Sequence, residues 1–378
     1  MQTEEDPRFL SEQLITCLGN KRTLLPLLEA AVRHVAADVG RDRLVTFDAF
    51  SGSGVVSRLL KRHSVELHAN DMERYAEVAS RCHLANAAEV DGEALAAWHT
   101  ALTARLRDDA LRPGAIAANY SPRDEYAIRS GERVFYTPRN AAYLDSARAM
   151  LEEVPPALRV LLLGPLLAAA SVHANTAGVF KGFYKDRETG LGRFGGRNED
   201  ALGRIKGAIH LALPVLSRFS ARVHVHRGDA NEVARTLGPL DLAYLDPPYN
   251  QHPYGSNYFM LNLIADGQPP TAPSRVSGIP AAWNRSAYNV RRRCAERLAD
   301  LVGALDARWV VVSYSSEGFI LPEEMVALLG RFGQVLVHET RYNTFRGCRN
   351  LSARDRHVKE FVFLVRKRSR GAVTAADA

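Results

Sequence analysis

The sequence predicts an α/β protein whose doubly wound, mostly parallel sheet is interrupted by a mainly helical insertion. Residues 44–72 read as a strand, a glycine turn, a helix and a second strand. Five more apolar, β-branched stretches follow residue 220, whereas the chain from about 91 to 219 shows helical patterns and loops without a convincing strand. With 378 residues the chain is long enough to bury a full core.

The first part of the sheet can be followed residue by residue. "RLVTFDAF" (43–50) is an apolar run that predicts a strand, and "SGSG" (51–54) predicts a turn. "VVSRLLKRH" (55–63) predicts a helix, and "VELHAND" (65–71) predicts a second strand that ends in a carboxylate. A further helix is expected from about 73 to 88. This order is typical of the opening of a doubly wound sheet.

The remaining elements define the expected domains. Helices are expected at 93–110, 140–153, 158–174 and 198–218, and strands at 221–229, 240–246, 307–315, 334–343 and 358–367. The last two strands are expected to form an antiparallel pair at the sheet edge. The sequence thus predicts one α/β domain (13–91 and 220–368), split by a helical insertion (92–219) and followed by a disordered tail (369–378).

Composition excludes several classes of protein. The chain is 46% hydrophobic, and its beginning, "MQTEEDPRF", is acidic and lacks the apolar segment of a signal peptide. The most apolar stretch, 160–170, is too short to span a bilayer and predicts a buried helix. The four cysteines (Cys17, Cys82, Cys294, Cys348) form no CxxC pair. We therefore expect a cytoplasmic protein in a reducing compartment, with no membrane contact and no metal site.

Positive charge is concentrated near the end of the chain. The formal net charge is +7, and the segment from Arg341 to Arg370 holds ten Lys and Arg residues against only Asp355 and Glu360. A localised basic stretch indicates a polyanionic partner, most often nucleic acid. A solvated strand edge protected by charge is the alternative, and it stays open at this point.

The turn after the first strand is suited to a nucleotide-like ligand. Gly52 and Gly54 permit a tight turn and close approach of a ligand to the backbone, and the amides of the following helix point the same way. Asp71 ends the second strand, where a carboxylate can accept hydrogen bonds from ribose hydroxyls. A dehydrogenase would show the same pair, so these residues do not identify the cofactor.

A second chemical signal is the stretch "LAYLDPPYN" (242–250). Asp246 ends an expected parallel strand, where ligands bind in such sheets. Pro247 and Pro248 have no amide proton, so few local donors compete for the carbonyls of Asp246 and Pro247. Tyr249 adds a ring that can stack on a base. Two acceptors and a stacking ring suit an amino group on a flat heterocycle. A strand end that contains two prolines for purely structural reasons would show the same residues.

These motifs, and their order along the chain, resemble those of the D12 class of DNA adenine N6-methyltransferases, a class that includes the DNA adenine methylases. The position of the insertion before "DPPY" is that of the α group of this class. "CLGNKRTLL" is similar to the family's leading cofactor motif, whose lysine falls on Lys21. "HAND" matches its second-strand motif through Asp71, and "RGDA" matches the motif before the catalytic strand through Asp229. "DPPYNQHPYGSNYFMLNLI" extends the likeness. The chain departs from the family at Cys17, usually aromatic, and at Asn20, commonly glycine.

The resemblance implies a class I, Rossmann-like fold that uses S-adenosylmethionine. Residues 13–91 and 220–368 would then form the catalytic domain, and 92–219 would recognise the target sequence. The implied catalytic residues are Asp246, Pro247, Pro248 and Tyr249. The implied cofactor-binding residues are Cys17, Lys21, Asp48, Phe50, Gly52, Gly54, Asp71, Asp229 and Asp246. No metal is required.

The implied chemistry needs an adenine outside the base stack. Asp246 and the Pro247 carbonyl would accept the amino hydrogens of a flipped adenine, and Tyr249 would stack on its face. Tyr254, Tyr258 and Phe259 either close this pocket or simply pack in a helix.

Two basic segments are candidates for DNA contact. "GVFKGFYKDRETGLGRFGGR" (178–197) combines glycines, aromatic residues and basic residues, of which Lys181, Lys185, Arg193 and Arg197 are expected to contact DNA. A flexible aromatic loop there could also enter a groove, while a plain surface loop remains the alternative. The second segment is "RYNTFRGCRNLSARDRHVK" (341–359), with Tyr342 and Arg346 as candidates and Phe345 near the flipped base.

The resemblance therefore implies a site-specific DNA (adenine-N6) methyltransferase, prokaryotic or phage-encoded, acting on double-stranded DNA as a monomer or weak dimer. A cognate restriction endonuclease is a candidate partner. Three alternatives remain: an RNA (rRNA) adenine N6-methyltransferase, a non-catalytic nucleic-acid-binding protein on the same fold, and a dinucleotide oxidoreductase. The last would leave "DPPY" and the basic segment without a purpose.

Overall fold

The computed structural model describes residues 4–196, 200–343 and 357–368, and the chain divides into two compact units. The helical unit contains residues 1–20, 73–218 and 254–284, and the sheet unit contains residues 21–72, 219–253 and 285–378. Residues 73–91 and 254–284, which the sequence pattern assigns to the α/β domain, cluster with the helical unit. The segment 369–378 lies outside the described residues.

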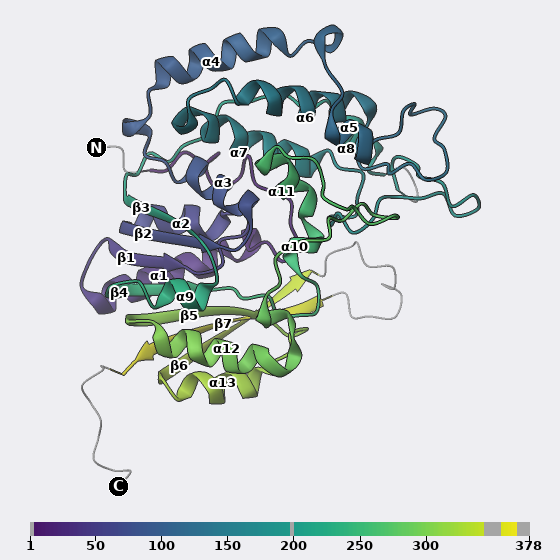
Figure 1. Ribbon diagram of the computed structural model, residues 1–378. Helices are drawn as coiled ribbons and strands as arrows, with labels where there is room; N and C mark the ends of the chain where they lie inside the picture. The colour runs from purple at the N-terminus through teal and green to yellow at the C-terminus, as the bar shows by residue number, and fades with distance from the viewer. Residues whose placement is uncertain (1–3, 197–199, 344–356, 369–378) are drawn as a thin grey trace. The chain divides into compact units, whose positions relative to one another are not determined.

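One seven-stranded sheet forms the sheet unit (Figure 1). Its order is β3-β2-β1-β4-β5-β7-β6. The strands are β1 (Leu44–Asp48), β2 (Ser64–Asp71), β3 (Arg222–Arg227), β4 (Leu240–Leu245), β5 (Ala307–Ser315), β6 (Gly333–Asn343) and β7 (His357–Lys367). Strands β1 to β5 run parallel, while β7 is antiparallel to both β5 and β6. The predicted doubly wound, mostly parallel sheet and its antiparallel final pair are confirmed.

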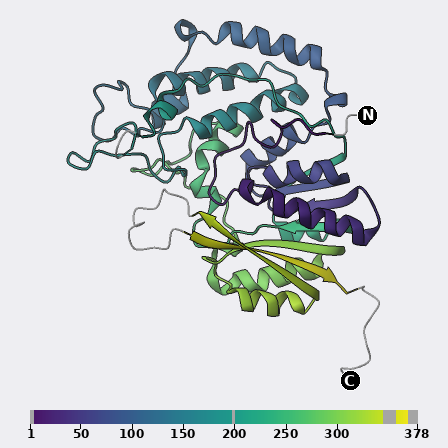
Figure 2. The same cartoon turned by 180° about the vertical axis from the view of Figure 1, so that it is seen from behind.

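Helices cover both faces of this sheet. They are α1 (Leu25–Val39), α2 (Val55–His63), α9 (Ala230–Ala234), α12 (Arg291–Ala304) and α13 (Pro322–Gly330), with short 3-10 turns η1 (Arg22–Leu24) and η4 (Ala287–Asn289). Figures 1 and 2, seen from opposite sides, show α12 and α13 on one face and α1 and α2 on the other. Every residue of β4 is buried as a result, which explains why this strand reads as a nearly continuous apolar run.

The helical unit is built around its own core. Its helices are α3 (Arg74–His83), α4 (Gly92–Arg105), α5 (Ala115–Tyr120), α6 (Pro138–Leu151), α7 (Pro156–Val172), α8 (Leu202–Lys206), α10 (Tyr254–Asn257) and α11 (Phe259–Asp266), with 3-10 turns η2 (Ala87–Glu89) and η3 (Asp108–Ala110). The apolar stretch 160–170 lies in α7 and is mostly buried, as predicted. Within the described ranges, no helix is both long and apolar enough to cross a membrane.

Three helix predictions are wrong in extent. The helix expected at 198–218 is only α8, the helix expected to reach residue 88 ends at His83, and the helix expected to reach residue 110 ends at Arg105. Beyond α8 the chain is irregular because distant side chains accept its amide hydrogens. The N–H groups of Ile209 and Leu211 donate to Asn140 Oδ1 (3.0 Å) and to the Tyr143 hydroxyl (2.7 Å). These bonds replace the ones that a helix would have supplied.

Close contact between α3 and α7 makes Gly164 a sensitive position. A Cβ atom there would lie 2.6 Å from both Cβ and Sγ of Cys82. Gly164→Ala should therefore lower the free energy of unfolding by about 1–3 kcal/mol through overpacking, outweighing the gain of roughly 1 kcal/mol that alanine usually brings in a helix. Urea unfolding measures this. Gly203→Ala in α8 is the control, because nothing lies within 4 Å of its added Cβ, and an equal effect of both variants would contradict the prediction.

Candidate active site

Three acidic residues lie at the carboxyl ends of parallel strands. Asp48 is the last residue of β1 and Asp71 the last of β2, and Asp246 comes directly after β4. In the register of the sheet, Asp48 pairs with Ala69 of β2 and with Tyr244 of β4. The carboxyl ends of the three strands therefore meet at one edge, which is where ligands bind in open α/β sheets.

The turn after β1 has the shape that the glycines predict. Gly52 and Gly54 have φ angles of +51° and +79°, in the left-handed region that favours glycine. The Gly54 N–H donates to the Ser51 carbonyl (2.7 Å), and the Gly52 N–H donates to Oδ2 of Asp71 (2.8 Å). A Cβ on Gly54 would meet nothing within 4 Å, so the backbone borders open space at this position. Part of the Asp71 carboxylate thus fixes the turn, a role that the sequence pattern did not predict.

Asp48 is completely buried beneath this turn. Ser57 Oγ donates to its Oδ2 (2.5 Å), and the Phe50 N–H donates to its Oδ1 (3.4 Å). Burial raises the pKa of Asp48 to about 7 despite these two hydrogen bonds, and the nearby Asp246 and Asp71 raise it further. In the described part of the chain no cation is paired with Asp48, whose hydrogen-bond donors are both neutral.

The charge of Asp48 should make stability depend on pH. Its folded-state pKa of about 7 lies above the ordinary 3.8, so the folded protein binds the extra proton and stability falls as pH rises through 7. Between pH 5 and 7 the cofactor-free protein should lose about 2 kcal/mol of unfolding free energy through this group, and little more above pH 8. In Asp48→Asn this loss should disappear, as urea unfolding at the two pH values would show. Identical pH dependence in both proteins would contradict the assignment.

A buried ion pair holds the carboxylate of Asp246. Lys21 Nζ lies 3.0 Å from Asp246 Oδ1, and the lysine side chain is only 3% exposed whereas that of Asp246 is 20% exposed. Burial disfavours the ammonium form of Lys21, but the neighbouring Asp246, Glu360 and Tyr249 outweigh it and raise its pKa. Burial raises the pKa of Asp246, and Lys21 counteracts this. One face of the carboxylate is thus fixed while the group remains partly accessible.

The residues after Asp246 are held by the segment that follows β5. The Phe319 N–H donates to the Tyr249 carbonyl (2.9 Å), and the Tyr249 ring packs edge-on against Tyr314 at 6.0 Å. Burial raises the pKa of Tyr249 to about 12, so its hydroxyl stays neutral at physiological pH. Among the residues that the structure describes, none donates a hydrogen bond to the Pro247 carbonyl. That carbonyl and Asp246 can therefore serve as two acceptors beside one ring.

The structure adds two residues that the sequence reasoning missed. Glu360 of β7 is buried, its charge raises the pKa of Lys21, and Asp246 in turn raises the pKa of Glu360. Asn70 is also buried, and its Nδ2 donates to the carbonyls of Ala49 (3.0 Å) and Gly228 (3.2 Å), which ties the chain after β1 to the chain after β3. A single carboxylate before an apolar run in "VKEFVFLV" was the available signal for Glu360.

Two other predicted cofactor residues have structural contacts in the sheet unit. Asp229 caps α9, with Oδ1 accepting from the Asn231 N–H (2.9 Å), and it forms an ion pair with Arg297 (2.7 Å). The Phe50 ring lies edge-on against Tyr288 at 5.2 Å. A cofactor contact by either residue stays a prediction.

The predicted residues in the helical unit pack locally. Cys17 is half-buried against the unit's hydrophobic core. The Leu18 N–H donates to the Tyr258 hydroxyl (2.6 Å), and the Tyr254 hydroxyl donates to the Leu18 carbonyl (3.1 Å). Tyr258 and Phe259 are buried in the same core. Ordinary helix packing, one of the two interpretations of these aromatic residues, is thus what the structure shows for Tyr258 and Phe259.

The loop 178–196 has a packed base and an exposed tip. Phe180 and Phe194 are buried, and Phe183 packs edge-on against Phe135 at 5.2 Å. These rings pack within the helical unit in this structure, although Phe183 is only partly buried. Entry of this loop into a DNA groove stays a prediction. Lys181 and Lys185 are exposed. Arg193 is partly exposed and lies 3.8 Å from Asp186.

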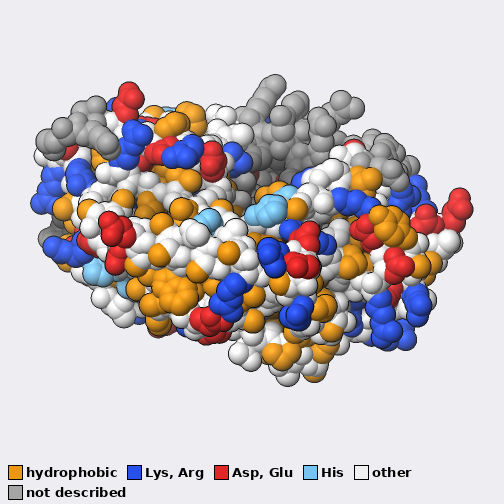
Figure 3. Space-filling model, turned by 90° about the horizontal axis from the view of Figure 1, so that it is seen from above, with side chains coloured by type: hydrophobic (Ala, Val, Ile, Leu, Met, Phe, Trp, Pro, Cys, Tyr) orange, Lys and Arg blue, Asp and Glu red, His pale blue; other side chains and the backbone are white. Residues whose placement is uncertain are grey.

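Several DNA-binding predictions cannot be placed. Arg197, Phe345 and Arg346 lie outside the described residues, and Tyr342 belongs to β6 but its side chain is not described. Figure 3 shows basic and acidic side chains interspersed on the face in view rather than one continuous basic field. Any electrostatic attraction on that face must therefore come from local groups of basic residues.

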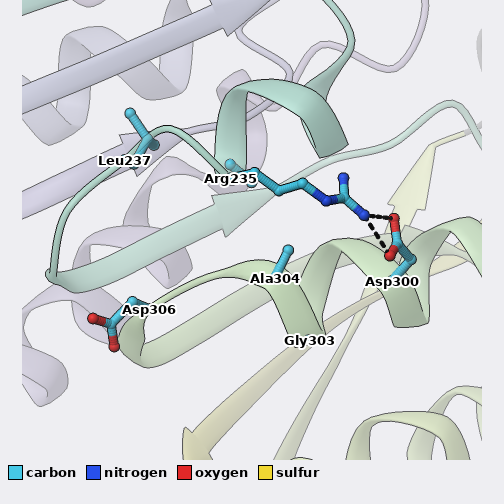
Figure 4. A pocket seen from close by; sticks show the side chains of 7 residues that line it. Arg235, Leu237, Asp300, Gly303, Ala304 and Asp306 are labelled. Atoms are coloured by element: carbon cyan, nitrogen blue, oxygen red, sulfur yellow. Dashed lines mark hydrogen bonds and ion pairs between the residues drawn. The ribbon is translucent and has the colours of Figure 1, made fainter.

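Two further features of the sheet unit lie apart from these carboxyl ends. A pocket of about 540 Å³ borders the residues that precede β4 and β5, and Figure 4 shows the guanidinium of Arg235 directed at the carboxylate of Asp300 inside it. Glu66, His68 and His224 bring potential metal-binding atoms within 4.8 Å of one another. The rings of His68 and His224 are stacked at 16°, however, so their in-plane nitrogen lone pairs do not converge in this arrangement.

Comparison with known proteins agrees with this geometry. The chain is 28% identical over 359 residues to the type II methyltransferase M.NlaIII of Neisseria lactamica, covering 92% of this chain and 97% of that protein. It is also 28% identical over 327 residues to the type II methyltransferase M.CviAII of Paramecium bursaria Chlorella virus 1, covering 84% and 89%. Against the type II methyltransferase M.FokI of Planomicrobium okeanokoites it is 24% identical over 370 residues, which cover 93% of this chain but 52% of that protein.

The family comparison covers both compact units. A family model described as D12 class N6 adenine-specific DNA methyltransferase matches residues 18–326, a range that includes Lys21, the glycine turn and Asp246. The mostly parallel seven-stranded sheet is consistent with the fold of such an enzyme. The chain belongs to the D12 class of N6 adenine-specific DNA methyltransferases.

Proposed function

We propose that this protein transfers the methyl group of S-adenosylmethionine to N6 of an adenine that has been swung out of double-stranded DNA. The observation that carries the proposal is the pair of acceptors at the end of β4. The Asp246 carboxylate is held by Lys21 at 3.0 Å, and the adjacent Pro247 carbonyl has no hydrogen-bond donor among the described residues.

The residues near the glycine turn fit the proposed cofactor. S-adenosylmethionine, when bound, supplies an electrophilic methyl group. The open space at Gly54 allows a ligand to approach the backbone, and Asp71 ends the strand next to it. The buried Asp48 offers a carboxylate for an ammonium group, because its partners among the described residues are neutral donors. Lys21 forms an ion pair with Asp246. We therefore propose that its main role is to hold this catalytic carboxylate and that binding the cofactor is secondary.

Asp246 and Pro247 act on the nucleophile. Adenine N6 is a weak nucleophile because its lone pair is delocalised into the ring. Hydrogen bonds from both amino hydrogens to the two acceptors favour a pyramidal nitrogen with a localised lone pair. That lone pair forms the N–C bond as the S–C bond breaks and its electrons remain on sulfur. The methylated nitrogen then loses one proton to solvent, and Tyr249 stacks on the base throughout.

We further propose that the helical unit recognises the target sequence and that exposed Lys181 and Lys185 contact phosphates. The names of the relatives support a modification role in a type II restriction-modification system, with a cognate endonuclease as the functional partner.

Methyl transfer is tested with labelled S-adenosylmethionine, unmethylated double-stranded DNA and, separately, ribosomal RNA. The products are digested to nucleosides and separated. N6-methyldeoxyadenosine from the DNA is the expected product. Methyladenosine from RNA alone would favour the RNA alternative, N4-methyldeoxycytidine would overturn the assignment of the base, and no product would overturn catalysis. Sequencing of methylated bases in DNA from expressing cells then identifies the recognition sequence.

A further inference from the structure

The buried Lys21 is paired with one carboxylate and lies within the electrostatic influence of a second. Its Nζ lies 3.0 Å from Asp246 Oδ1, and the charge of Glu360 also acts on it. Glu360 is 4% exposed, and its Oε2 has no hydrogen-bond partner in the described part of the chain. In the register of the sheet Glu360 lies opposite Ser315, at the end of β5. Leu245, which directly precedes Asp246, lies opposite Val312 of β5, so Asp246 and Glu360 flank the same end of β5 on its two sides.

Burying the ionised carboxylate of Glu360 is unfavourable unless a nearby group compensates for its lost hydration. A buried carboxylate costs several kcal/mol in lost hydration, and Lys21 is the cation whose charge offsets this cost here. The ammonium group of Lys21 pairs with Asp246 and acts on Glu360 through its charge, so the three groups carry a net charge of −1 when all are ionised. A glutamine at position 360 would have filled the same space without this cost.

We propose, on the basis of the proposed function, that Glu360 is a positioning residue that acts through Lys21. The negative charge of Glu360 offsets part of the positive potential that Lys21 creates at Asp246, so Lys21 does not neutralise Asp246 completely. An oxygen of Asp246 therefore stays available to the adenine amino group. The cluster also keeps a net negative charge next to N6, the atom on which positive charge develops as the methyl group arrives.

A purely structural Glu360 would behave differently. Burial raises the pKa of Glu360, while Lys21 and a hydrogen bond with the Ser315 side chain lower it, and Asp246 and Glu317 raise it again. If Glu360 were a neutral acid that only fills space, a glutamine of the same shape would replace it without consequence. The charge-sharing role instead requires an ionised Glu360, so the two possibilities differ in the behaviour of Glu360→Gln.

The test measures kcat, the KM for DNA and the pH profile of kcat in the full-length protein. Glu360→Gln should lower kcat about 10–100-fold, with the KM for DNA and the calorimetric Kd for S-adenosylmethionine within about threefold of wild type. Loss of the neighbouring negative charge lowers the pKa of Asp246, so the acidic limb of the profile should move to lower pH. The control is Glu339→Gln on the adjacent β6, where the exposed carboxylate pairs with Lys359 (2.8 Å), and it should resemble wild type.

Charge restoration provides the second readout. The double variant Lys21→Met, Glu360→Gln returns the cluster to a net charge of −1. Its kcat should therefore exceed the value expected when the activation free-energy changes of the two single variants are added. Glu360→Asp should retain more activity than Glu360→Gln, and it serves if the glutamine variant fails to fold. Wild-type kcat and pH profile in Glu360→Gln would overturn this inference alone. Absence of methyl transfer by the wild-type protein would instead overturn the proposed function.

Discussion

Replacing Asp246 with alanine should lower kcat for adenine methylation by about 10²–10⁴-fold while DNA binding remains measurable. The substitution removes one of the two acceptors for the amino hydrogens, so the N6 lone pair stays delocalised. It also leaves the ammonium of Lys21 without the partner that lies 3.0 Å away. Single-turnover methyl transfer and DNA binding by fluorescence anisotropy measure the two quantities separately.

The same strand supplies a matched control for this variant. Asp241, near the start of β4, is also a buried carboxylate, and its Oδ2 accepts from the Val45 N–H (2.9 Å) and pairs with Arg41 (3.3 Å). Asp241→Asn changes a buried acid at the opposite end of β4, so it should keep kcat within about threefold of wild type. Retention of more than a tenth of wild-type kcat in Asp246→Ala would contradict the assigned role of this carboxylate.

Replacing Asn175 with alanine should weaken DNA binding about tenfold or more without changing cofactor affinity. Asn175 is fully buried, and its Nδ2 donates to the carbonyls of Val134 (2.7 Å) and Arg193 (2.9 Å), which fixes the base of the loop that carries Lys181 and Lys185. Alanine leaves these buried carbonyls unsatisfied, at a cost of about 1–3 kcal/mol each. The loop should then open locally, as anisotropy at fixed salt and limited proteolysis near Lys185 would show.

An asparagine that supports only its own helix is the control. Asn119 Nδ2 donates to the Ala115 carbonyl (2.9 Å) within α5, and Asn119→Ala should leave DNA affinity within about twofold. If Asn175→Ala opened the loop to protease yet bound DNA normally, the loop would have no part in DNA binding.

Local patterns were sufficient for the strands. The run from Ala307 to Ser315 is apolar and β-branched and is bounded by polar residues, and β5 occupies these residues. The glycine turn was likewise predictable, since only glycine readily adopts the φ angles found at Gly52 and Gly54. Both features depend on neighbours in sequence, which is why a single chain reveals them.

Contacts between distant segments were not predictable in this way. Motifs identified Lys21 and Asp246 separately, but they did not show that the two residues form an ion pair. The sequence around Ile209 predicts a helix, but the structure is irregular there, and the Ile209 N–H donates to Asn140 of the distant α6. Glu360 gains its significance only because β7 lies between β5 and β6, which places it opposite Ser315. Sequence patterns identify residue types and elements, whereas the charges that surround a residue depend on the completed sheet.

The position of β7 also constrains the order in which the protein can fold during synthesis. β7 is the last of the seven strands to leave the ribosome, yet it is an interior strand that joins β6 to the rest of the sheet. Until residues 357–367 have emerged, the apolar β5 has an unpaired edge and β6 has no partner. A nascent or truncated chain is therefore exposed to edge-to-edge aggregation. Because Glu360 arrives with the same strand, the charge cluster around Lys21 is assembled only when that edge is covered.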